Sequence, residues 1–70
     1  MMNHQVAEEA LNQIVMAIGD LGIHIGDTAI LPPEVDQAPR LRQLAQMAED
    51  IVLLVRAGEA VIRNTATAAP

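Results

Sequence analysis

The sequence predicts an all-α fold, a two-helix hairpin with a long packed linker that dimerises into a four-helix bundle. Apolar residues recur at alternating spacings of three and four in two separate segments, which is the pattern of helices packed along a seam. The second segment also holds five consecutive apolar residues, 51–55, which point in every direction around a helix. The chain has 70 residues, no cysteine and no aromatic residue. A core this small seldom supplies more than about 3–5 kcal/mol, so we expect oligomerisation to stabilise it.

The first helix is predicted over residues 3–21 of a single domain that spans residues 1–70. Its seam follows spacings of 4, 3, 4 and 3 and consists of Ala7, Leu11, Ile14, Ile18 and Leu21. Asn3 is a residue type that caps helix N-termini, and Gly22 suits the left-handed conformation that often ends a helix. We therefore expect this helix to stop at Leu21.

Residues 22–38 are predicted to form the packed linker. Ile23–Ile25 alternates in the manner of a short extended segment, and Gly26-Asp27 is typical of a turn. Pro32-Pro33 is incompatible with the interior of a helix. The linker carries further apolar residues that we expect to bury against the helices, namely Ile30, Leu31 and Val35.

The second helix is predicted over residues 39–64, and residues 65–70 are expected to fray. Its main seam is predicted to consist of Leu41, Leu44, Ala48, Ile51, Val55, Gly58 and Ile62, with a second stripe beside it at Met47, Leu54 and Val61. One neighbouring helix cannot cover so much apolar surface. The predicted oligomer interface is Leu44, Met47, Ile51, Val52, Leu54, Val55 and Val61.

The charge of the chain excludes several classes of partner. The formal net charge is -5, and the four basic residues are all arginines. Nucleic-acid binding needs a basic stripe, often with stacking aromatic residues, and the sequence has neither. Anionic membranes would repel the chain, and no apolar run approaches the ~18 residues of a membrane span. The first residues lack the positive region of a signal peptide, so we expect a cytoplasmic location.

Catalytic and metal sites have little support in the sequence. With no cysteine and no serine, the chain lacks the usual nucleophiles, so we expect no enzymatic activity and no cofactor. Asp20, His24 and Asp27 are weak candidates for metal ligands, but a solvated helix end explains the same residues.

Two apolar residues interrupt otherwise polar stripes, Met16 on the first helix and Leu53 on the second. They are candidate contacts with another protein, although singly exposed apolar residues are also normal. We therefore expect a small non-enzymatic protein–protein interaction module, an adaptor, regulator or inhibitor, that acts as a helical homo-oligomer.

Two alternatives remain open. The helix–proline loop–helix plan resembles small secretion-needle subunits and their two-helix chaperones in architecture, without a diagnostic motif. That resemblance implies a structural or chaperone-like subunit of a larger assembly, such as a secretion apparatus. The more remote alternative is a metal- or ligand-binding enzyme subunit, which would use Asp20, His24 and Asp27.

Overall fold

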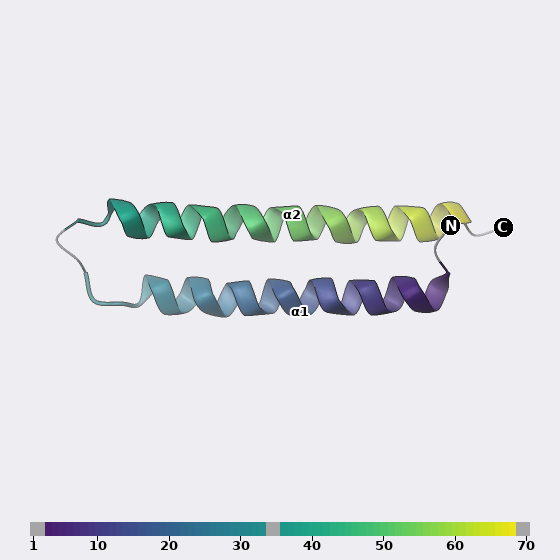
Figure 1. The fold of residues 1–70 in the computed structure, drawn as a ribbon, viewed down its shortest axis with the longest axis horizontal. Helices are drawn as coiled ribbons and strands as arrows, with labels where there is room; N and C mark the ends of the chain where they lie inside the picture. Colours follow the sequence, from purple (N-terminus) through teal and green to yellow (C-terminus); the bar gives the residue numbers. More distant parts are fainter. Residues whose placement is uncertain (1–2, 34–35, 69–70) are drawn as a thin grey trace.

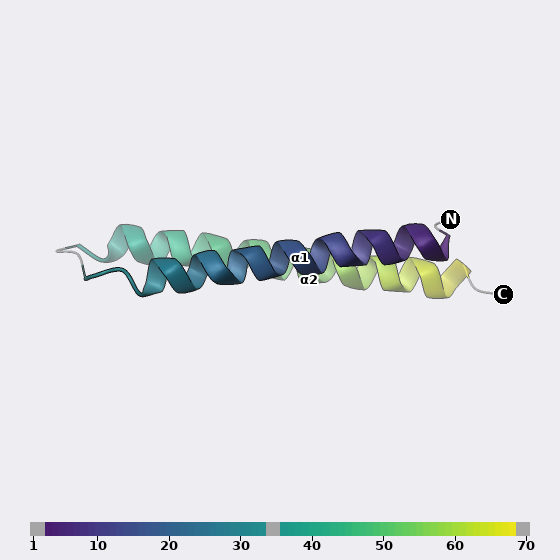
Figure 2. The ribbon, with the colours of Figure 1, turned by 90° about the horizontal axis from the view of Figure 1, so that it is seen from below.

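The computed structural model describes residues 3–33 and 36–68, which form two helices packed side by side as an antiparallel hairpin (Figure 1). Helix α1 spans His4–Ala29 and helix α2 spans Ala38–Ala68. Seen from below, the helices cross near their middles (Figure 2), as helices in coiled-coil packing do. The rod measures 58 × 15 × 10 Å along its principal axes. The predicted all-α helical hairpin is confirmed.

Helix α1 begins at the predicted cap. The Asn3 side chain is outside the helix and its Oδ1 accepts a hydrogen bond of 2.8 Å from the backbone N–H of Val6. The Asn3 carbonyl accepts the first backbone bond, from Ala7 at 3.0 Å. The cap therefore satisfies donors that a helix N-terminus otherwise leaves without partners.

Helix α1 does not stop at Leu21 as predicted. It continues through Gly22 and Gly26, and no described residue has a positive φ, so neither glycine adopts the left-handed conformation. The predicted extended segment at 23–25 and turn at 26–27 are wrong for the same reason. The seam explains the difference, because Ile25 and Thr28 continue the spacing of four and three beyond Leu21 and are half-buried. Packing these residues outweighs the roughly 1 kcal/mol that each glycine costs in a helix.

The connection between the helices is shorter than predicted and does not pack as a linker. Helix α1 takes up residues 22–29. Most of the side chains that we expected to bury remain exposed, since Ile23 is 64%, Ile30 80% and Leu31 53% exposed, whereas Ile25 is half-buried as part of α1. Val35, the last apolar residue of the predicted linker, lies outside the described residues.

Helix α2 is held to the connection by its first turn. Arg40 donates hydrogen bonds from Nη1 to the Leu31 carbonyl (3.0 Å) and from Nη2 to the Pro32 carbonyl (2.6 Å). Asp36 Oδ1 accepts a bond of 3.0 Å from the Ala38 backbone, a local Asx turn that starts the helix. The arginine thus fixes the path by which the chain leaves α1 and enters α2.

The far end of α2 extends beyond its predicted limit. The helix runs to Ala68, past the predicted end at Asn64 and into the tail that we expected to fray. Thr65 Oγ1 donates a bond of 2.9 Å to the Val61 carbonyl one turn earlier. Residues 69–70 of the predicted tail lie outside the described part.

The core of the hairpin is one seam, here called the inner seam. Helix α1 contributes Ala7, Leu11, Ile14, Ile18, Leu21 and Ile25, and α2 contributes Leu44, Met47, Ile51, Leu54, Gly58 and Val61. Ala7, at 2% exposure, is the one fully buried hydrophobic residue in the described part of the chain, and the larger side chains of the seam are half-buried. A single layer between two helices leaves their remaining faces in solvent.

Candidate interaction surface

The five-residue apolar run of α2 is covered on one side only. Ile51 and Leu54 lie in the inner seam, whereas Val52 is 48%, Leu53 62% and Val55 45% exposed. Three exposed valine or leucine side chains within four residues of one helix form more apolar surface than isolated exposed residues do.

The predicted oligomer interface divides into two groups. Five of its members, Leu44, Met47, Ile51, Leu54 and Val61, lie in the inner seam against α1 of the same chain. The other two, Val52 and Val55, are exposed on a neighbouring face of α2. Only the second group is accessible on the surface of the hairpin, and its role between two chains stays a prediction.

We call this neighbouring face the side ridge. It follows spacings of 4, 3, 4, 3, 4 and 3 along α2 and consists of Leu41, Ala45, Ala48, Val52, Val55, Glu59 and Ile62. Leu41 is 63% and Ile62 56% exposed. The sequence assigned four of these residues, Leu41, Ala48, Val55 and Ile62, to the main seam, and this assignment is wrong. The stripe at Met47, Leu54 and Val61 packs against α1 instead.

A stripe with the same spacing runs along α1, and its residues from Gly19 onward are small. We call it the glycine stripe, and it consists of Glu8, Asn12, Val15, Gly19, Gly22, Gly26 and Ala29. A Cβ added to any of its three glycines would meet nothing within 4 Å. The stripe is therefore a shallow, open strip of helix surface between larger side chains.

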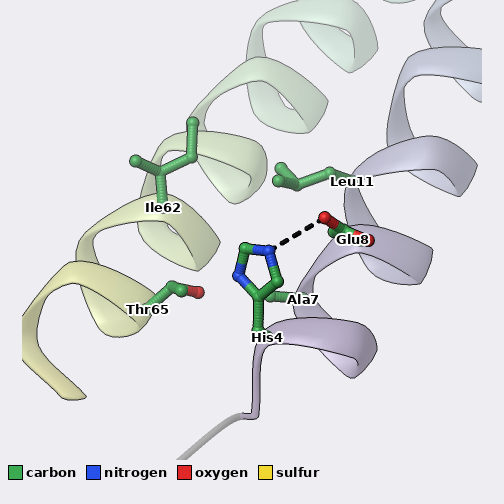
Figure 3. A pocket seen from close by; sticks show the side chains of 6 residues that line it. All are labelled: His4, Ala7, Glu8, Leu11, Ile62 and Thr65. Carbon is green, nitrogen blue, oxygen red and sulfur yellow. Dashed lines mark ion pairs between the residues drawn. The ribbon is translucent and has the colours of Figure 1, made fainter. Parts of the chain in front are cut away.

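The side ridge and the glycine stripe lie on the same side of the hairpin. Their end members, Ile62 of α2 and Glu8 of α1, line one hollow of about 270 Å³ (Figure 3). The same hollow is lined by His4, Ala7, Leu11 and Thr65. His4 Nε2 lies 2.9 Å from Glu8 Oε1 at its mouth, and both side chains are largely exposed. One broad face of the molecule thus combines an apolar ridge on α2 with a low strip on α1.

Met16 and Leu53, the predicted contacts with another protein, are both exposed, at 69% and 62%. Met16 belongs to a line that faces away from α2 and continues at intervals of seven through Ile23 on α1 to Ile30, the C-cap residue of that helix. Sequence reasoning missed the last two because it assigned them to the linker. Leu53 lines a separate hollow of about 360 Å³ on α2 with Ala48, Glu49 and Val52.

The metal candidates occupy an exposed side of α1. Because α1 continues past Gly22, Asp20, His24 and Asp27 stand on successive turns of one helix. Within residues 3–33 and 36–68, no three histidine or acidic side chains are grouped so that they could hold a metal ion.

Charge is distributed unequally between the two helices. Helix α1 carries four acidic residues, Glu8, Glu9, Asp20 and Asp27, and neither lysine nor arginine. All four arginines are on α2, at positions 40, 42, 56 and 63, together with Glu49, Asp50 and Glu59. The outer surface of α1 is therefore acidic, and that of α2 carries the positive charge of the chain.

Neither described helix has the length and apolar character that a membrane crossing requires. Comparison of the chain with protein-family models, with curated proteins and with solved structures finds no match.

Proposed function

We propose that this protein is a small non-enzymatic protein–protein interaction module, an adaptor, regulator or inhibitor, that works as a helical homodimer. The observation that carries the proposal is the exposure of Val52, Leu53 and Val55 beside the half-buried Ile51 and Leu54. A two-helix hairpin covers one stripe of α2, and a second pair of helices covers the next, which gives a four-helix bundle. The cytoplasmic location expected from the sequence is part of this proposal.

Stability supports the same proposal. In the described part of the chain, Ala7 is the only buried hydrophobic residue. Chains of this size usually need disulfides, a metal or oligomerisation to supplement so small a core. The sequence has no cysteine, so disulfides are excluded and association between chains is the simplest supplement.

The surface for a different protein is proposed at Met16 on α1 and at Leu53 on α2. Both side chains are more than half exposed, and Met16 is extended by Ile23 and Ile30 into an apolar line about 20 Å long. An apolar line on an acidic helix suits a partner with an apolar groove and a basic rim.

A second candidate function is a structural or chaperone-like subunit of a larger assembly, such as a secretion apparatus. The Met16 line favours it, because this line and the side ridge lie on different faces of the hairpin. Two different adhesive faces allow head-to-tail contacts that do not close, and such contacts build filaments or tubes.

Mass in solution tests the proposal. We expect light scattering to give twice the 7.5 kDa of the chain, independent of protein concentration. A mass that grows steadily with concentration would favour the larger assembly. A fully helical monomer would contradict both functions, because the apolar faces would then be stable in water.

A further inference from the structure

We propose that two copies pack face to face with their loops at the same end, so that the side ridge of each copy lies on the glycine stripe of the other. This inference rests on the proposed dimer and specifies its symmetry, with a two-fold axis parallel to the helices. Two hairpins can also pack face to face about an axis perpendicular to the helices. In that case α1 would face α1, α2 would face α2, and the loops would lie at opposite ends.

Side-chain size favours the parallel axis. It sets Leu41 against Ala29 and Val52 against Gly19 of the second copy, so large side chains of the side ridge meet small ones of the glycine stripe in this part of the interface. The perpendicular axis sets ridge on ridge and glycine on glycine. The large side chains between the two α2 helices would then keep the two α1 helices too far apart to pack.

The register of the hairpin gives an independent match. Ile62 and Glu8 lie at the same height along the axis of the hairpin. Because the helices are antiparallel, moving one residue towards the C-terminus of α2 corresponds to moving one residue towards the N-terminus of α1. A parallel two-fold axis keeps every residue at its own height, so the facing pairs between copies follow directly. They are Leu41 with Ala29, Ala45 with Gly26, Ala48 with Gly22, Val52 with Gly19, Val55 with Val15, Glu59 with Asn12, and Ile62 with Glu8. The single charged residue of the side ridge, Glu59, thus faces a polar side chain and not an apolar one.

The area of this face is sufficient for a stable dimer. From Leu41 to Ile62 the side ridge is about 32 Å long, and two helices side by side are about 20 Å wide. The footprint of about 640 Å² is a projected area, and the accessible area of an uneven surface is larger. It is therefore close to the ~800 Å² per partner of a standard interface.

The glycines of the stripe lower the stability of α1, and the proposed dimer gives a reason for their presence. Three glycines within eight residues of α1 weaken the helix, and none of them is in a positive-φ conformation or close to α2. Within the hairpin, alanine would fit at each position. Their small size is useful where a second helix approaches from outside.

Spin labels measure the orientation directly, because the chain contains no native cysteine. A label at Pro33→Cys reports the distance between the two loops, and a label at Glu49→Cys, near mid-height, reports dimer formation in either arrangement. We expect both pairs to lie within about 30 Å, since neighbouring helices in a bundle are about 10 Å apart and the labels add their own length. A loop-to-loop distance of about 50 Å with a short Glu49 distance would overturn the orientation and leave the dimer standing. A monomeric mass with no dipolar coupling at either site would instead contradict the proposed function.

A pair of variants tests the contact itself. Gly19→Leu fits the isolated hairpin, where a side chain has open space, but would collide with Val52 of the second copy. We expect at least a tenfold weaker dimer for Gly19→Leu, and an unchanged dimer for Gln13→Leu, an exposed position of α1 outside the glycine stripe. A Gly19→Leu protein that retains the parent dimer affinity would overturn the proposed contact.

Discussion

Gly58 of α2 lies directly against Ile14 of α1. A Cβ added to this glycine would stand 3.7 Å from Ile14 Cγ2 and 3.8 Å from Leu11 Cδ2, which are ordinary van der Waals distances. Gly58 is buried in the inner seam while the glycines of the outer stripe are exposed. The contact therefore has room for a methyl group and for little more.

The first prediction follows from this contact: two substitutions of Gly58 should change the stability of the protein in opposite directions. Gly58→Ala should stabilise the protein by up to about 1 kcal/mol, because it removes the helix cost of glycine without a clash. Gly58→Leu should destabilise it by about 1–3 kcal/mol, because the larger side chain forces the helices apart. Urea unfolding measures both, and Ala57→Leu, on an exposed neighbouring position, is the control for added bulk. Equal effects for Gly58→Leu and Ala57→Leu would show that the helices do not approach at Gly58.

Adjacent leucines on α2 should respond differently to a charge. Leu54 is half-buried in the inner seam, so Leu54→Glu should cost several kcal/mol and unfold much of the chain. Leu53 is 62% exposed, so Leu53→Glu should change stability by no more than about 0.5 kcal/mol. Circular dichroism with thermal melting distinguishes the two. A folded Leu54→Glu protein with the parent melting temperature would contradict the observed register of α2.

The exposure of the connection predicts that its apolar side chains contribute little to stability. Ile30 is 80% exposed, and Ile30→Ala should change the free energy of unfolding by less than about 0.5 kcal/mol. Ile51→Ala, in the inner seam, should cost about 2 kcal/mol. Denaturant unfolding at one protein concentration compares them. A loss at Ile30 as large as that at Ile51 would mean that the connection packs after all.

Arg40 should stabilise the hairpin through the carbonyls of Leu31 and Pro32. Both bonds are exposed to solvent, so Arg40→Ala should cost only about 1 kcal/mol. Arg42→Ala removes the same charge two residues later and serves as the control, with an expected change near zero. Hydrogen exchange at the first turn of α2 should accelerate in Arg40→Ala only. Equal acceleration in both variants would attribute the effect to charge and not to the two hydrogen bonds.

The apolar spacing predicted the two helices, and the misjudged boundary has a specific cause. Gly22 was interpreted as a helix terminator and Gly26-Asp27 as a turn, yet helix propensity is a weak preference that packing overrides. The spacing that reaches Leu21 continues through Ile25 and Thr28, and following it would have placed the end of α1 correctly.

The choice between the two stripes of α2 could not be made from spacing. The inner seam and the side ridge both follow the alternation of three and four, and both are rich in Leu, Ile and Val. Which stripe packs against α1 depends on the direction in which α2 leaves the connection, and that direction is a property of the folded chain. The Met16 line was missed because of the misplaced end of α1, since Ile23 joins it only when the helix continues past Gly22, with Ile30 following as the C-cap residue.

The two hydrogen bonds from Arg40 to the Leu31 and Pro32 carbonyls also give the hairpin a starting point for folding. Contacts near the connection join residues that are close in sequence, whereas Thr65 and Ala7, which line the same hollow at the other end, are separated by nearly the whole chain. The entropic cost of closing a loop rises with that separation. Contacts between the helices should therefore form first near Arg40 and then progressively towards Asn3. Opening should run in the reverse order, with the end that holds His4 and Glu8 separating first and the turn beside Arg40 last.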